Sequence, residues 1–149
     1  MRYHTVTSSI WEDEKFRPLT PFEKVVFLYL STNLRCPVSG VYKISLETIA
    51  FESNVPKIEE LMNSLCEKGL IAYDFKRNQL WVRGKINNSG VNYKSYIAVK
   101  SIINDLEEAK GCSWYMVFFD KYPQLADIAI ELEAMKNVHY HNQKNKSSL

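Results

Sequence analysis

Between residues 40 and 83, the apolar positions change their period several times, and each change predicts a new element. Residues 40–44 alternate between apolar and polar side chains, which is typical of a short strand. Residues 46–50 then carry apolar side chains at helical spacing, directly after Ser45, whose hydroxyl suits the N-cap of a helix. The polar triplet 52–54 is expected to end this first helix of the region.

The next helix has the clearest apolar stripe in the chain, with apolar side chains at i, i+3, i+4 and i+7. Pro56 is expected in its first turn, where a missing N–H costs nothing, and Gly69 suits the left-handed position that follows many helices. We therefore expect a helix over residues 56–68 with its polar face open to a partner. The inward side chains of this helix are Ile58, Leu61, Met62 and Leu65.

A β-hairpin is predicted after this helix, because two apolar runs at 70–73 and 79–82 flank the polar stretch 74–78. Strand, helix, turn, amphipathic helix and hairpin, in that order, make up the winged helix-turn-helix. A capping box at 20–23, with Pro21 at the first helical position, predicts one more helix before it. The expected fold class is α+β and mostly helical: a winged helix-turn-helix of three helices and a β-hairpin wing, with a C-terminal helical extension.

Two segments near the N-terminus are expected to contribute to the core. Residues 8–16 are predicted to form a short helical turn anchored by Trp11 and Phe16, since large aromatic side chains seldom stay exposed. The helix that begins at Pro21 is expected to turn an apolar stripe inward. The members of this stripe are Phe22, Val25, Val26, Tyr29 and Leu30.

A polar stretch at 84–90 marks the expected domain boundary. Beyond it, residues 96–106 carry a heptad-like apolar seam, and residues 114–119 are so densely apolar that they need burial. This apolar surface exceeds what one winged helix needs, so a homodimer is expected. The expected divisions are 1–86 for the winged-helix domain (core 20–86, N-terminal arm 1–19), 91–136 for a helical extension packed on it or on a second copy, and 137–149 for a frayed polar tail.

Composition narrows the class of protein. The 149 residues are 46% hydrophobic, which suffices for a filled core, and no apolar run reaches the ~18 residues that span a bilayer. The three cysteines are widely spaced and lack a CxxC pair, so neither a disulfide framework nor a thiolate zinc site is expected. We therefore expect a cytoplasmic protein that neither crosses a membrane nor binds a cofactor.

The charge is small but uneven. The net charge of +2 is low for a protein that binds duplex DNA. Residues 70–85 carry four cations and one acid, whereas residues 55–69 carry two cations and three acids. The wing is therefore expected to bind phosphates better than the helix at 56–68.

With these elements in place, the chain resembles the winged-helix amino-terminal module of phage and Gram-positive replisome-organiser proteins, which are related to DnaD-type primosome components. The resemblance covers about residues 3–125. It implies DNA binding in phage replication initiation, with a helicase or its loader as a partner. The matching phrases are SSIWEDEKFRPLTPFEKVVFLYLSTN, SGVYKISLETIAFESNVPKIEELMNSLCEKGLIAYD, QLWVRGKI, KSIINDLEEA and WYMVFFDKYPQL.

If the chain binds double-stranded DNA, the polar face of the helix at 56–68 enters the major groove, where Asn63 suits adenine and Lys57 suits guanine or a phosphate. The hairpin tip then touches phosphates or the minor groove. Each of these assignments has an alternative without DNA. The helix face can be merely solvated, the hairpin tip can be an ordinary charged turn, and Ser45 can serve only as a helix cap. The candidate DNA-binding residues are Ser45, Thr48, Asn54, Lys57, Glu60, Asn63, Ser64, Lys76, Arg77 and Asn78.

No catalytic arrangement is recognisable, so the chain is not expected to be an enzyme. It has no phosphate-binding Gly-rich loop, and the pair His139 and His141 lacks a third metal ligand. Three hypotheses stay open at this point. They are DNA binding in replication initiation, DNA binding as a transcriptional regulator, and a protein-interaction or self-assembly scaffold that does not contact DNA.

Overall fold

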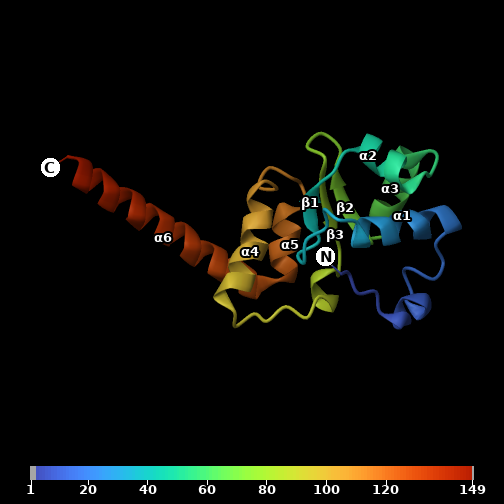
Figure 1. The fold of residues 1–149 in the computed structure, drawn as a ribbon, viewed down its shortest axis with the longest axis horizontal. Helices are drawn as coiled ribbons and strands as arrows, with labels where there is room; N and C mark the ends of the chain where they lie inside the picture. The colour runs from blue at the N-terminus through green and yellow to red at the C-terminus, as the bar shows by residue number, and fades with distance from the viewer. Residues whose placement is uncertain (1–2, 149) are drawn as a thin grey trace. The chain divides into compact units, whose positions relative to one another are not determined.

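The computed structural model describes residues 3–148, and the chain divides into two compact units, with the division between Trp114 and Tyr115 (Figure 1). The predicted boundary at 84–90 lies inside the first unit. The first unit contains η1 (Ser8–Glu12), α1 (Pro21–Thr32), β1 (Val41–Lys43), α2 (Leu46–Ser53), α3 (Ile58–Glu67), β2 (Ile71–Asp74), β3 (Gln79–Val82), η2 (Ile86–Asn88) and α4 (Tyr96–Glu107). The second contains α5 (Tyr115–Lys121) and α6 (Pro123–Ser147).

The predicted fold class is confirmed at its coarser level: the protein is α+β and mostly helical, with one small antiparallel sheet. The strand order is β1-β3-β2, with Tyr42 and Tyr73 both opposite Leu80 on the central strand. Helices α1, α2 and α3 lie on one side of this sheet and α4 on the other (Figure 1). All four residues of β3 are buried, and the Trp81 ring packs 5.8 Å from the ring of Trp114.

Helix α1 begins with the predicted capping box. The Thr20 N–H donates to the Glu23 carboxylate over 3.1 Å, and the Glu23 N–H donates to the Thr20 hydroxyl over 3.3 Å. The predicted core stripe of α1 is partly wrong, because Phe22 and Val25 are 53% and 46% exposed. The helix is rotated so that the carboxylate of Glu23 lies inside with Val26, since that carboxylate has polar partners on α3.

The N-terminal segment also departs from expectation. Phe16 is buried in the core as predicted, but Trp11 is 58% exposed and contacts the Phe16 ring edge-on at 5.5 Å. Residues 3–7, which belong to the predicted N-terminal arm, form neither helix nor strand. The first two residues of the predicted arm lie outside the described part of the chain.

The turn between α2 and α3 lies about two residues later than predicted. Asn54 and Lys57 both adopt left-handed backbone conformations with φ of 54°, so α3 begins at Ile58 and Pro56 lies in the connection. Gly69, at φ 76°, ends α3 as predicted. The Leu70 N–H donates to the Leu65 carbonyl over 3.1 Å, which is the bond of a Schellman motif.

Gly40 provides a test of the packing around the sheet. Its φ is 74°, and a Cβ at this position would lie 2.8 Å from the Val82 carbonyl oxygen and 2.8 Å from the Lys85 Cβ. Gly40→Ala should therefore lower the free energy of unfolding by about 2 kcal/mol, since a left-handed alanine is strained even without a clash. Urea unfolding followed by circular dichroism measures this loss. The matched control is Gly90→Ala, which carries the same left-handed strain but has nothing within 4 Å of the added Cβ, so it should lose less stability than Gly40→Ala.

The second unit consists of α5 and the long helix α6. The Phe118 ring packs 5.5 Å from Phe119 and 5.0 Å from Tyr122, so much of the predicted aromatic cluster is buried. Met116 and Val117 in that cluster are exposed, so this part of it is not buried within the chain itself, and burial against a partner stays a prediction. The frayed tail predicted at 137–149 is also wrong for the described residues, because α6 continues to Ser147.

Candidate nucleic-acid interface

Helix α3 turns the expected side outward. Met62 and Leu65 are fully buried, whereas Lys57, Glu60 and Asn63 are exposed. The predicted orientation of this helix is therefore confirmed. The exposed side chains around its axis include three glutamates, so its outer surface is more acidic than basic. These glutamates are Glu59, Glu60 and Glu67.

Ser64 was expected on the outer face of α3, but its hydroxyl faces inward and donates to the Glu23 carboxylate over 2.8 Å. The Lys68 ammonium donates to both oxygens of the same carboxylate, over 2.9 and 2.8 Å. We call Thr20, Glu23, Ser64 and Lys68 the polar network. Burial alone raises the pKa of Glu23, but the hydrogen bonds from Lys68, Thr20 and Ser64 outweigh it and lower the pKa to about 2. Ser64 therefore joins α3 to α1.

The Ser45 and Thr48 hydroxyls at the start of α2 form a hydrogen bond with each other. Ser45 accepts the Thr48 N–H over 3.1 Å as the N-cap, and the two hydroxyl oxygens lie 2.9 Å apart. Both residues are half-buried. Capping explains this geometry without a phosphate.

The hairpin tip, residues 74–78, is held by its own polar groups. The Asp74 carboxylate accepts the N–H groups of Lys76 and Arg77 over 3.0 Å each, and the Arg77 guanidinium lies 3.2 Å from it. Burial raises the pKa of Asp74, yet these hydrogen bonds together hold it below its usual value. Asn78 has φ 55°, and its side-chain oxygen accepts from the Tyr73 hydroxyl over 3.1 Å. Asn78 therefore shapes the turn.

The tip also packs against the segment that follows α4. A Cβ at Gly111 would lie 2.8 Å from two nitrogens of the Arg77 guanidinium, so that side chain lies over the glycine. The Cys112 thiol faces Asp74: burial raises the pKa of the thiol, and the neighbouring carboxylate raises it further. Arg77 is thus half-exposed and paired, and Lys76 is the outward-facing cation of the tip.

One exposed cation near the tip was missed by the prediction of site residues. Lys43 lies opposite Gln79 in the sheet, one residue from the hairpin tip, and its side chain is exposed. The strand alternation at 40–44 indicated that Lys43 points outward. Only the pairing of β1 with β3 brings it next to the tip.

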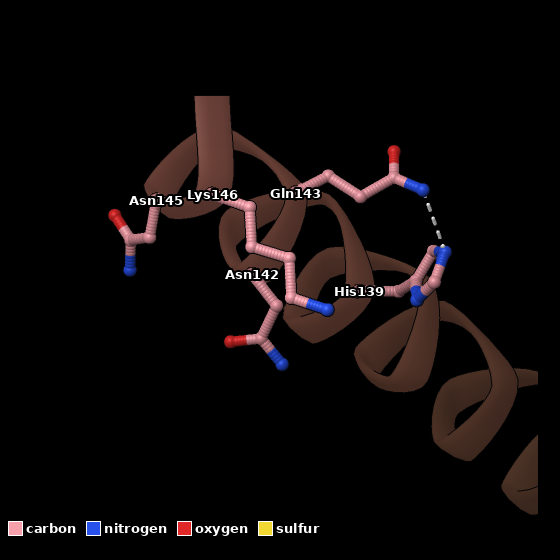
Figure 2. Close-up of a pocket in the computed structure, with 5 residues that line it drawn as sticks. All are labelled: His139, Asn142, Gln143, Asn145 and Lys146. Carbon is pink, nitrogen blue, oxygen red and sulfur yellow. Dashed lines mark hydrogen bonds between the residues drawn. The ribbon is translucent and has the colours of Figure 1, made fainter. Parts of the chain in front are cut away.

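No metal site is seen in residues 3–148. No group of three or more His, Cys, Asp or Glu side chains gathers there. His139 and His141 lie two residues apart on a helix, so they point to different sides of α6. A hollow of about 400 Å³ is lined by side chains from successive turns of α6 alone, so it is a stretch of helix surface. Figure 2 shows these side chains along the helix. Its lining residues are His139, Asn142, Gln143, Asn145 and Lys146.

The comparisons with known proteins give no relative: no protein-family model, no curated protein and no solved structure matches the chain. Within residues 3–148, even the longest helix, α6, falls short of the apolar content that a bilayer-crossing helix requires.

Proposed function

We propose that this chain is a DNA-binding winged-helix protein that acts in phage or prophage replication initiation, as a replisome organiser or in primosome assembly. The order α1, β1, α2, α3, β2, β3 and the sheet order β1-β3-β2 support the winged-helix assignment. The replication role rests on the resemblance of the sequence to replisome-organiser modules. A helicase or its loader, and a second copy of the chain, are the proposed protein partners in the cytoplasm.

The observation that carries the proposal is the exposed amino-terminal part of α3. Asn54 and Lys57 are exposed just before α3, the helix that reads base edges in winged-helix proteins, and Glu60 is exposed in its first turn. Asn63 is exposed about one turn further along. Lys76 lies at the hairpin tip, where a wing contacts phosphates. Asn63 supplies the amide that pairs with adenine in the major groove.

Titration of the full chain with duplex DNA at two salt concentrations tests this proposal. A DNA-binding protein loses affinity with salt at a slope of about −0.9 per phosphate contact. Saturable binding with a steep salt dependence is the expected result. Absence of saturable binding at low salt would contradict the proposal.

Lys76→Ala should weaken binding to all duplex sequences alike and reduce the salt slope by about 0.9, because it removes one phosphate contact. Lys94→Ala, which removes an exposed lysine outside the proposed interface, is the matched control. Equal affinities of the two variants would exclude the wing from the site. Lys76 is preferred to Arg77 here, because loss of Arg77 also breaks its ion pair with Asp74.

A second candidate function is a protein-interaction or self-assembly scaffold without DNA contact. The acidic outer surface of α3 favours it, since Glu59, Glu60 and Glu67 repel phosphates. The pairing of Arg77 with Asp74 also reduces the charge that the wing offers. Sedimentation analysis that finds stable oligomers, together with no saturable DNA binding at low salt, would favour this function.

A further inference from the structure

The last four turns of α6 carry the positive charge that α3 lacks. Residues 134–148, which we call the basic segment, contain three lysines and no aspartate or glutamate, and all of their side chains are exposed. The whole chain has a net charge of +2 and this segment supplies +3, so the remaining residues sum to −1. The excess positive charge of the protein is therefore concentrated on one exposed stretch of helix.

The polar groups of the basic segment are arranged along one face. Lys136, His139, Gln143 and Lys146 recur at 3-4-3 spacing, which places them on the same side of a helix. The two lysines are ten residues apart, or about 15 Å along the axis. Between them, the Gln143 amide and the His139 imidazole form a hydrogen bond of 3.0 Å (Figure 2). The face thus has a cation at each end and hydrogen-bonding groups between them.

We propose that the basic segment of α6 is a second binding site for duplex DNA, with the helix lying in the major groove. This inference rests on the proposed function for its ligand, but its site is separate from α3 and the wing. The helix diameter of about 10–12 Å matches a major groove about 12 Å wide. Lys144 and Lys146 are two residues apart and point to different sides of the helix, so they reach the phosphates on the two sides of the groove. Asn142 and Gln143 supply side-chain amides of the kind that pair with adenine.

Duplex DNA fits this surface better than other polyanions. The major groove of double-stranded RNA is too narrow for a helix. A helix that binds anionic membranes needs a broad apolar face opposite its lysines. In the basic segment, the large apolar side chains are Met135, Val138 and Tyr140, and Lys144 covers the Tyr140 ring at 5.1 Å. The helix therefore presents polar and cationic groups over most of its circumference.

The test compares two triple variants of the full chain that lose the same charge. Lys136→Gln, Lys144→Gln and Lys146→Gln together neutralise the basic segment, and glutamine keeps a similar helix propensity. The control combines Lys15→Gln, Lys94→Gln and Lys100→Gln, three exposed lysines of the first unit. Circular dichroism verifies equal helix content. Affinity for a duplex DNA of mixed sequence is then measured at several salt concentrations, with duplex RNA and anionic vesicles as further probes.

The basic-segment variant should bind DNA about 100-fold more weakly at low salt, with a salt slope smaller by about 2.7, whereas the control should bind like the parent. Equal losses in both variants would overturn the inference, as would equal affinity of the parent for duplex RNA or for the vesicles. If Lys76→Ala weakens binding and the basic-segment variant does not, this inference fails and the proposed function stands. If the parent protein binds no DNA, both fail.

Discussion

Replacement of Leu65 by alanine should lower the free energy of unfolding by about 2–5 kcal/mol. Leu65 is fully buried in the core between α1, α3 and the sheet, beside other fully buried side chains such as Met62 and Leu80. Truncation removes three carbon atoms from contact and leaves a cavity, because α3 is fixed at its end by the Schellman motif at Gly69 and cannot move in to fill it. Urea unfolding of the two proteins at the same pH measures the loss.

The outer face of α3 provides the matched control. Asn63→Ala lies on the same helix, is exposed, and should change the stability by less than about 0.5 kcal/mol. Leu61 is only partly buried, so Leu61→Ala should cost less than Leu65→Ala. If Asn63→Ala destabilised the protein more than Leu65→Ala, the faces of α3 would be reversed and its polar side would no longer be available to DNA.

Acidification should destabilise the protein through Glu23. The pKa of Glu23 in the folded protein is about 2, below its ordinary value of 4.5, so folding favours the charged carboxylate. The Glu23 carboxylate therefore contributes fully to the free energy of unfolding above about pH 4.5, and this contribution is lost as the pH falls through 2. The difference in pKa corresponds to about 3 kcal/mol. Thermal unfolding between pH 6 and pH 2 measures this loss.

Glu23→Gln separates this effect from the titration of other acids. Glutamine keeps the size of the side chain but cannot titrate, so the variant should be less stable than the parent at pH 6 and should approach it at pH 2. Equal pH dependence of the two proteins would mean that the polar network with Ser64 and Lys68 adds nothing specific. This network matters for function, because it fixes how α3 lies on α1 and hence which side chains of α3 face outward.

These placements separate the candidate DNA-binding residues into two groups. Asn54, Lys57, Glu60, Asn63 and Lys76 are exposed, as a nucleic-acid interface requires. The others hold the fold together: one caps α2 by accepting the N–H of a second, one joins α3 to α1, and two shape or brace the hairpin tip. These residues are Ser45, Thr48, Ser64, Arg77 and Asn78.

The sequence by itself determined the order of the elements, the start of α1 at its capping box, the end of α3 at Gly69 and the inward side of α3. Each of these follows from interactions within a few residues, namely helical period, caps and turn conformation, so each leaves a local pattern. The length of α6 is the exception, since its polar residues 137–147 have no apolar period that marks them as helix.

Only the tertiary structure decided where the polar side chains point. Ser64 turns inward because the carboxylate of Glu23, 41 residues earlier in the chain, accepts its hydroxyl. Arg77 lies over Gly111 because the segment after α4 passes beside the hairpin tip. Such pairings join residues far apart in the chain, and either partner alone looks like an ordinary surface residue. Periodicity assigns a side chain to a face of its helix, but the partner that it meets there depends on how the elements pack.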